Sequence, residues 1–273
     1  MNLNEIDIPS IINKILSSRK YRDSGLNPET IHDLILKEID NQPTEKALVK
    51  SVRRKLHNIV APYLGEPDYS KLITQLEKIE NPIPSHPEIK ELCWEALSKH
   101  ASTKERLPFI TSFYDQLFKQ TGKPSSVLDL ACGLHPLAFP WMGLETSIQY
   151  HAYDIIQPRI EFINIFFKKI GLAPLAENRD VLVNPPKIKA DLAIFFKEAH
   201  RFQKRQLGCN QDFWENLNVD KLVVSLPAQD LSGTHNLSSQ QRELVNNNLP
   251  LHQGVHELLI ENELIFIIDK NGG

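Results

Sequence analysis

Three acidic residues and one glycine are spaced along the chain in a way that suits the binding of a nucleoside. Asp129 lies inside the apolar run 126–131, Gly133 follows that run, Asp154 comes 21 residues after the glycine, and Asp180 another 26 residues on. A glycine turn at a strand end lets backbone N–H groups approach a ligand, and an acid at the next strand end can accept both hydroxyls of a ribose. Asp180 is then placed for an adenine amino group. The alternative is that the three acids are caps and loop residues, but their shared register favours a ligand.

The single glycine also narrows the choice of ligand. The dinucleotide fingerprint G-x-G-x-x-G is absent from this turn, which disfavours a pyrophosphate. One glycine turn, one ribose acid and one adenine acid together favour S-adenosylmethionine. The N-P-P stretch at 184–186 marks amino-group methyltransferases when it follows the fourth strand and precedes an aromatic residue. Here it follows the third expected strand and precedes Lys187, so we interpret it as a proline turn.

Strands and helices that alternate along the chain must position these residues. Short apolar runs predict strands at 126–131, 149–153, 175–180, 190–196, 221–226, 254–260 and 263–268. The clearest helical pattern between them begins at Pro158 and stops at Gly171. This alternation predicts an α/β fold with a doubly wound parallel sheet. The last two runs are joined only by Glu261 and Asn262, so we expect a hairpin whose final strand is antiparallel, the usual form of class I (Rossmann-like) methyltransferases.

The region before this sheet reads as helices joined by proline-rich turns. Asn27-Pro28 is a helix start signal, and the segment 81–87 holds three prolines and predicts a loop. Two stretches, 14–22 and 46–55, carry four and five cations without an acid, although the net charge of the chain is −3. A solvated helix face is the common fate of one such cation, and a net charge of −3 is not the overall signature of a nucleic-acid-binding protein.

Composition excludes several other classes of protein. The chain has 273 residues, 41% of them apolar and 24% charged, as in an ordinary globular protein. No apolar run approaches the roughly 18 to 20 residues that span a bilayer, and the first 20 residues are too polar for a signal peptide. Cys93, Cys132 and Cys209 show no C-x-x-C spacing, so we expect no metal site, no disulfide framework and a cytoplasmic protein.

Several segments, in the same order along nearly the whole chain, resemble one family. They are S-S-R-K-Y-R (17–22), R-R-K-L-H-N-I-V-A-P-Y (53–63), H-A-S-T-K-E-R-L (100–107), V-L-D-L-A-C-G-L-H-P-L-A (127–138), R-D-V-L-x-x-P-P (179–186), D-L-A-I-F-F-K (191–197) and E-L-I-F-I-I-x-K-N-G (263–272). The sequence thereby resembles the aminoglycoside-resistance 16S rRNA (guanine(1405)-N7)-methyltransferases. The segment 100–107 is particularly specific, since general methyltransferases lack it.

The resemblance implies a role for individual residues. Arg106 would hold the methionine carboxylate of S-adenosylmethionine, Ala131 and Gly133 would line its methionine part, and Lys197 would face the substrate. Asp154 would bind the ribose, and Asp180 with Val181 the adenine. Residues 1–106 would form a helical domain that docks on rRNA, and residues 107–273 the cofactor-binding domain. The cations expected to contact RNA are Arg19, Lys20, Arg22, Lys50, Arg53, Arg54 and Lys55.

The implied partner is the 30S ribosomal subunit, and we expect the protein to be a monomer without a membrane anchor. Two departures from the family stand out: His135 replaces an asparagine, and the loop 227–236 carries Gln229 and Asp230 where basic residues are expected. Two alternatives therefore stay open. One is a methyltransferase of the same fold that acts on another RNA or a small molecule, and the other is a non-catalytic rRNA-binding relative.

Overall fold

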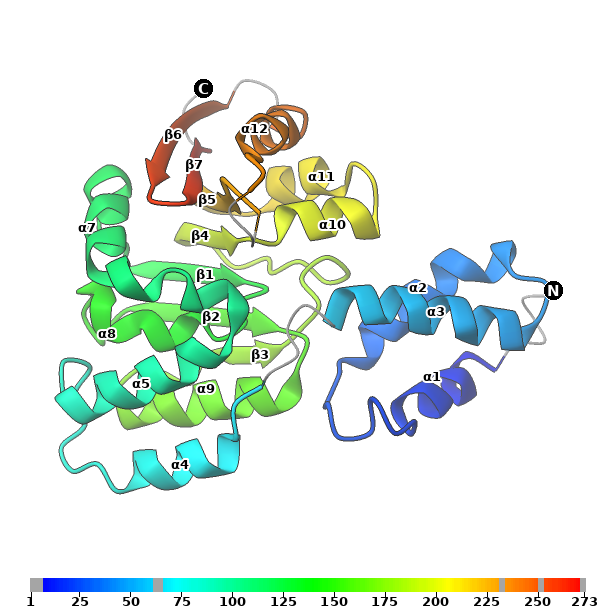
Figure 1. Ribbon diagram of the computed structural model, residues 1–273, viewed down its shortest axis with the longest axis horizontal. Helices are drawn as coiled ribbons and strands as arrows, with labels where there is room; N and C mark the ends of the chain where they lie inside the picture. The colour runs from blue at the N-terminus through cyan, green and yellow to red at the C-terminus, as the bar shows by residue number, and fades with distance from the viewer. Residues whose placement is uncertain (1–6, 61–65, 231–233, 250–252, 271–273) are drawn as a thin grey trace.

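A computed structural model describes residues 7–60, 66–230, 234–249 and 253–270. One sheet, covered by helices on both faces, forms the body, and a small helical lobe stands at its side (Figure 1). The lobe consists of α1 (Ile8–Leu16), α2 (Pro28–Glu38) and α3 (Glu45–Val60). Among the described residues, no helix has both the length and the apolar content needed to cross a membrane.

The body is built on a seven-stranded sheet of order β3-β2-β1-β4-β5-β7-β6. The strands are β1 (Ser126–Leu130), β2 (Gln149–Asp154), β3 (Ala176–Asn178), β4 (Ala190–Phe196), β5 (Val219–Pro227), β6 (Gly254–Ile260) and β7 (Glu263–Asp269). The pairs among β1 to β5 are parallel, whereas β7 pairs antiparallel with both β5 and β6. The predicted parallel sheet with a terminal antiparallel hairpin is therefore confirmed, as is each predicted strand.

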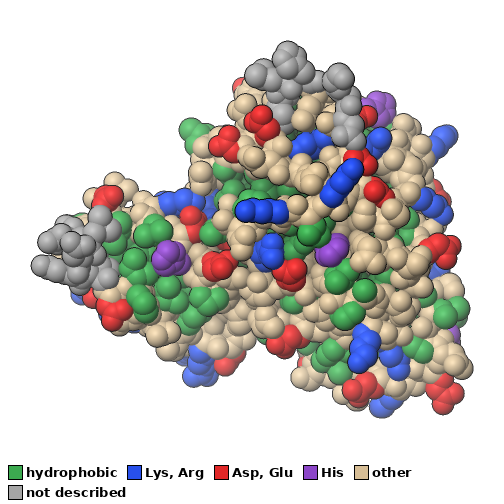
Figure 2. All heavy atoms as spheres, turned by 180° about the vertical axis from the view of Figure 1, so that it is seen from behind, with side chains coloured by type: hydrophobic (Ala, Val, Ile, Leu, Met, Phe, Trp, Pro, Cys, Tyr) green, Lys and Arg blue, Asp and Glu red, His purple; other side chains and the backbone are tan. Residues whose placement is uncertain are grey.

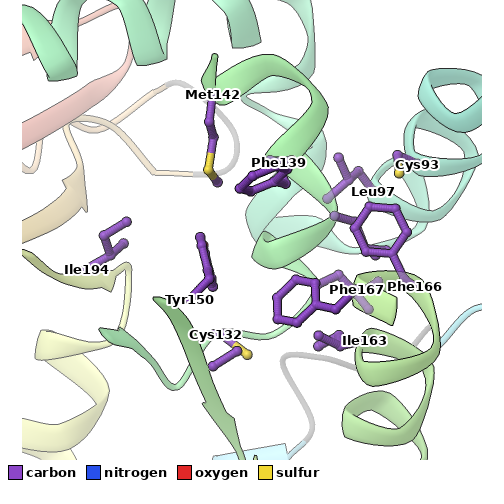
Figure 3. Close-up of a cluster of buried hydrophobic side chains, with 14 of the residues drawn as sticks. Cys93, Leu97, Cys132, Phe139, Met142, Tyr150, Ile163, Phe166, Phe167 and Ile194 are labelled. Carbon is purple, nitrogen blue, oxygen red and sulfur yellow. The ribbon is translucent and has the colours of Figure 1, made fainter. Parts of the chain in front are cut away.

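Helices cover each face because successive side chains of a strand point to opposite sides. On one face, Val127, Tyr150 and Ile194 pack with α4 (Tyr69–Glu77), α5 (Pro87–Lys99), α7 (Ile110–Thr121), α8 (Phe139–Met142) and α9 (Gln157–Lys169). Figure 3 shows part of this core, in which Tyr150 lies near Phe139 and Phe167. On the other face, Leu128 and Phe195 pack with α10 (Ala199–Arg205), α11 (Cys209–Asn216) and α12 (Ser238–Asn246).

Helix ends follow the signals in the sequence. The Asn27 side chain accepts a hydrogen bond from the Glu29 backbone N–H at 2.7 Å, and Pro28 opens α2 as predicted. The helix α9 begins at Gln157, one residue before the expected proline, and Gly171 follows its end with a φ of 88°. This left-handed conformation favours glycine, which explains why the helix stops there.

Hydrophobic packing separates α1–α3 from the rest of the chain. Buried residues from Ile11 to Leu56 form one cluster, to which the body contributes Ile156. Leu72, Ile89 and the other buried residues of α4 to α7 belong instead to the core of the sheet. Packing therefore groups these later helices with the body. The domain boundary expected between residues 106 and 107 stays a prediction, because packing alone does not define which parts fold independently.

The lobe is fastened to the carboxyl ends of β2 and β3. The Asn27 backbone N–H donates to the Ile155 carbonyl at 2.8 Å, and the Asn27 side chain donates to the Asn178 carbonyl at 3.1 Å. Gly25 allows this approach: it has a φ of 57°, and a Cβ there would lie 2.5 Å from Cδ of Pro158. The lobe and the strand ends thus share one wall, where the site lies.

Candidate functional site

A cavity of about 450 Å³ opens where β1, β2 and β4 end and the lobe begins. Ala131, Gly133 and Asp154 line it from the sheet, and Tyr21 and Ile59 line it from the lobe. Open α/β sheets bind ligands at the carboxyl ends of their strands, and the volume suits a small cofactor. On the face of the molecule drawn in Figure 2, acidic and basic side chains intermingle around an apolar centre where the lobe meets the body.

The turn after β1 has the close-approach geometry that its sequence predicts. Ala131 and Gly133 both have left-handed φ values, 52° and 54°. A Cβ at Gly133 would lie 3.1 Å from the His100 ring, so the glycine keeps this part of the cavity open. Ala131 is not a glycine, and an L-residue in this conformation is strained by roughly 1–2 kcal/mol. Such strain persists where the surroundings over-determine the backbone, often at functional sites.

Asp154 ties this turn to the end of β2. Its Oδ2 accepts hydrogen bonds from the Gly133 backbone N–H at 2.9 Å and from Arg159 Nη1 at 2.8 Å, and its Oδ1 accepts from the Ile156 backbone N–H at 3.0 Å. The side chain lines the cavity and is buried. Asp154 therefore lies where an acid that binds a ribose is expected. Its hydrogen bond to Gly133 also holds the turn after β1 without any ligand.

Asp180 joins the cavity to the lobe. Its Oδ2 accepts from Thr30 Oγ1 of α2 and from Arg205 Nη1, each at 2.7 Å, while Oδ1 accepts from the Leu182 backbone N–H at 3.1 Å. Val181 is buried beside it and also lines the cavity. The pair thus occupies the expected wall. A carboxylate oxygen can accept two hydrogen bonds, so Oδ1 can still accept one from an adenine amino group.

Arg106 is buried at the other end of the cavity. Its Nε and Nη2 both bond the carboxylate of Glu263, the first residue of β7, with Nε to Oε2 at 3.2 Å. The guanidinium lies 4.3 Å from the Phe113 ring centre and 4.5 Å from that of Phe196. Burial favours a neutral carboxyl, yet the charges of Arg106 and Lys197 hold the pKa of Glu263 below its ordinary value. Arg106 keeps N–H groups for a ligand carboxylate, but Glu263 already balances its charge.

Lys197 directly follows β4 and has a φ of 61°, so, like Ala131, it is a non-glycine residue in the left-handed region. Its Nζ lies 2.7 Å from Glu105 Oε2 and 3.9 Å from Glu263 Oε2. The lysine lines the cavity together with Arg106. The structure thus brings together Arg106, Ala131, Gly133, Asp154, Asp180, Val181 and Lys197 around one cavity. Their binding roles stay predictions.

His135, the first departure from the expected motif, is a buried hydrogen-bonding residue. Its Nδ1 lies 2.7 Å from Asp129 Oδ2, and its Nε2 lies 2.7 Å from the Tyr114 hydroxyl. The Tyr150 hydroxyl also donates to Asp129 at 2.8 Å. Asp129 is therefore satisfied behind the turn and does not line the cavity. Burial, together with the charge of Asp129, raises the pKa of Tyr150 well above its ordinary value.

The seven cations expected to contact RNA all lie on the lobe, and they differ in availability. Arg19, Lys20, Arg22, Lys50 and Arg54 are exposed, whereas Arg53 and Lys55 are half-buried. Lys55 pairs with Glu38, and Arg53 Nη2 donates to the Lys14 carbonyl at 3.2 Å. Lys50 and Arg54 stand four residues apart on one face of α3. Arg54 also borders a second cavity of about 500 Å³, which lies beside the first.

The loop after β5, the second departure, is closed by its own aspartate. Asp230 Oδ1 accepts the Thr234 backbone N–H at 2.9 Å, and its Oδ2 lies 2.9 Å from His235 Nδ1. Gln229 forms an isolated bridge with Asn236. Residues 231–233 of this loop lie outside the described residues. Asp230 thus has an internal role, and its negative charge remains at a surface where RNA is expected.

Sequence reasoning missed the partners of these residues. Arg159 binds Asp154 and Glu66, and Arg205 binds both Asp180 and Asp33. Arg159 comes five positions after Asp154, in the first turn of α9. A basic residue at that position was the sequence signal that could have indicated the pair. Glu198, which follows Lys197, was also missed, although it lines both cavities. Its burial raises the pKa of its carboxyl from 4.5 to about 8, with Arg201 opposing the shift.

A parallel sheet with a terminal antiparallel hairpin and a nucleoside-sized cavity at its central strand ends defines a class I methyltransferase. The model of the ribosomal RNA methyltransferase (FmrO) family matches residues 17–264, and the chain belongs to that family. It is 30% identical, over 274 residues and the full length of both chains, to a 16S rRNA (guanine(1405)-N(7))-methyltransferase of Serratia marcescens. A Micromonospora echinospora enzyme of the same name is 30% identical over 81% of this chain and 82% of its own. The solved structure of the 16S rRNA methylase RmtB has a TM-score of 0.81 and 28% identity, covering 97% of this chain and 99% of that one.

The buried carboxyl of Glu198 predicts a pH-dependent stability. The pKa of Glu198 is raised in the folded protein, so its neutral form favours folding below about pH 4.5 and this contribution is lost as the pH rises towards 8. We therefore compare the free energy of unfolding of the Glu198→Gln variant with that of the wild type. The difference should be more favourable to the variant at pH 8.5 than at pH 5, by on the order of 3 kcal/mol. Urea denaturation at both values measures this difference. The exposed Glu243→Gln is the control, and a Glu198→Gln effect that does not change with pH would contradict the assignment.

Proposed function

We propose that the protein transfers a methyl group from S-adenosylmethionine to N7 of guanine 1405 of 16S rRNA in the 30S subunit. The carrying observation is the cavity bounded by Gly133, Asp154 and Asp180, in a chain that aligns over its full length with enzymes of that name. The expected outcome in a cell is resistance to aminoglycosides that bind near this nucleotide. Action on ribosomal subunits also implies a cytoplasmic protein, which we propose acts as a monomer.

The residues of the cavity fit S-adenosylmethionine in three places. Gly133 leaves open the volume that a Cβ would fill, which suits the sulfonium and methionine part. Asp154 lies where it can accept from ribose hydroxyls, and Asp180 with Val181 offers an acceptor and an apolar surface for adenine. The remaining N–H groups of Arg106, helped by Lys197, would hold the methionine carboxylate. When bound, the cofactor supplies an electrophilic methyl group.

The chemistry asks little of the protein beyond position. Guanine N7 carries an in-plane lone pair and no proton, so its methylation needs no general base. The strained turn at Ala131 and the hydrogen bonds of Asp154 fix the cofactor side, and the end of β4 at Lys197 fixes the substrate side. Alignment of the two reacting atoms is then the main source of rate. The target base must leave its stack to enter the cavity.

Methylation of isolated 30S subunits tests the proposed function. With S-adenosylmethionine present, we expect N7-methylguanosine at position 1405, detected by chemical cleavage at the modified base and by mass spectrometry of the fragment. Naked 16S rRNA is the parallel substrate, which tests whether the protein acts on the assembled subunit or on free RNA. Methylation at another nucleotide or of naked RNA alone would favour a same-fold enzyme with a different substrate. Subunit binding without methyl transfer would favour a non-catalytic relative.

The Asp154→Asn substitution tests the cofactor site. It should weaken binding of S-adenosylhomocysteine at least tenfold, since one ribose acceptor becomes a donor and each hydrogen bond to a charged group contributes about 1.5–3 kcal/mol. Isothermal calorimetry on the folded variant measures the affinity. Asp191→Asn is a matched control, because Asp191 also accepts hydrogen bonds from backbone N–H groups, those of Ser125 and Ser126, at the opposite end of β4. Equal affinity in both variants would remove Asp154 from the site.

Charge reversal on α3 tests the docking surface. The exposed pair Lys50→Glu/Arg54→Glu should lower 30S affinity at least tenfold and flatten its dependence on salt, because phosphate contacts release counterions. Affinity for S-adenosylhomocysteine should not change. Fluorescence competition on 30S subunits across a salt series measures the 30S affinity and its salt dependence, and calorimetry measures the affinity for S-adenosylhomocysteine. Lys119→Glu/Lys168→Glu reverses two exposed lysines of the body, and equal losses in the two double variants would exclude a docking role specific to α3.

A further inference from the structure

Glu198 is a buried carboxylate that the cofactor assignments leave unused. It follows Lys197 at the end of β4, is 8% exposed and lines the cofactor cavity. Arg201 Nε lies 3.4 Å from its Oε1. Among the described residues, the carboxylate of Glu198 accepts no hydrogen bond. Its capacity as an acceptor is therefore available inside the cavity.

The other carboxylates that line this cavity accept hydrogen bonds or pair with cations. Asp154 and Asp180 each accept three hydrogen bonds from the protein. Glu66 accepts from Tyr69 and Arg159, and Asp23 is exposed and paired with Arg22. Burial disfavours a carboxylate that accepts no hydrogen bond, so a ligand that donates to Glu198 would stabilise its charged form.

Glu198 also lies where the two cavities meet. It borders the cofactor cavity on one side and the second cavity on the other. Five cationic residues line the second cavity, and Lys55 and Arg205 among them are paired with acids. The five are Arg54, Lys55, Arg201, Lys204 and Arg205. Such a lining suits RNA phosphates. A base that enters from this side towards the methyl donor would meet the wall that the two cavities share, which Ile59, Glu198, Phe202 and Arg205 line.

The chemistry of guanine matches a carboxylate in this position. Its N7 and O6 are acceptors on one edge, and this edge faces the methyl donor during transfer. Its N1–H and 2-amino group are donors on the far edge of the purine, and a carboxylate can accept from both. Adenine carries an unprotonated N1 there, whose lone pair a carboxylate would repel.

We infer that Glu198 determines specificity for guanine by accepting hydrogen bonds from its N1–H and 2-amino group. This assignment rests on the proposed methylation of guanine N7. It adds a substrate-binding residue to a site whose other carboxylates serve the fold and the cofactor. The raised pKa of Glu198 is consistent with it, because burial without donors disfavours the charged form and two donors from a base would favour it.

A purely structural role makes the opposite predictions. If Glu198 served only as the ionic partner of Arg201, removal of either residue would have the same effect. The Arg201→Gln variant removes the cation and keeps the carboxylate, while Glu198→Gln removes one acceptor and adds a donor that opposes the guanine N–H groups. Glu198→Asp keeps a shorter carboxylate and should restore part of the lost rate.

The experiment compares guanosine with inosine at position 1405 of reconstituted 30S subunits, because inosine lacks only the 2-amino group. Rates are measured at pH 8.5 with saturating S-adenosylmethionine. We expect the wild type to prefer guanosine about tenfold, as one lost charge-assisted hydrogen bond would give. Glu198→Gln should lower kcat/KM on guanosine about 10- to 100-fold and bring the preference close to one. Arg201→Gln should keep the wild-type preference.

The remaining outcomes overturn either the role of Glu198 or the proposed function, and they distinguish the two. Equal wild-type rates on the two subunits would overturn the role of Glu198 and leave the proposed function intact. An unchanged preference in Glu198→Gln, or an equal loss of preference in Arg201→Gln, would do the same. A wild type that does not methylate guanosine 1405 would overturn the proposed function itself. Urea denaturation of each variant shows whether it is folded, and Glu198→Asp supplies the test if Glu198→Gln is not.

Discussion

The cavity depends on one electrostatic constraint: an arginine buried beside it must meet a carboxylate. Arg106 meets Glu263, Arg159 meets Asp154, and Arg205 meets Asp180. Each pair joins two segments of the cavity wall: the segment before α7 to β7, the start of α9 to β2, and α10 to the end of β3. Loss of one member leaves a buried charge uncompensated, which typically costs 3–5 kcal/mol, so both members of each pair are needed to keep the cavity wall in place.

This constraint explains which features the sequence could predict. The strands and α9 were predictable because hydrophobic period and turn residues act within a short window. The positions of Gly133 and Asp154 followed from the same local reasoning. The partnership of Arg106 with Glu263 spans 157 residues, and no local pattern indicates it. Asp180 accepts hydrogen bonds both from Thr30 of the lobe and from Leu182 of its own loop. The bond to Thr30 could not be predicted for the same reason.

The pairing of charged residues was the feature that the sequence predicted least well. The stretch 46–55 contains no acid, yet Lys55 pairs with Glu38 of the preceding helix, and Lys14 pairs with Glu45. Helix packing supplies acids that are distant in sequence, so an acid-free run does not imply an uncompensated surface. The face of α3 that carries Lys50 and Arg54 keeps its charge because it points away from the partners that α3 packs against.

The fastening of the lobe to the strand ends has a consequence for synthesis. Asn27 and Thr30 leave the ribosome about 150 residues before Asn178 and Asp180, with which they bond. The lobe can form its own small core early, because its contacts are local, but its place beside the sheet waits for the third strand. The last strand pair, which carries Glu263, arrives later still. A nascent chain therefore cannot complete the wall of the cofactor pocket until Glu263 has been translated, and ligand binding would report that these distant segments have come together.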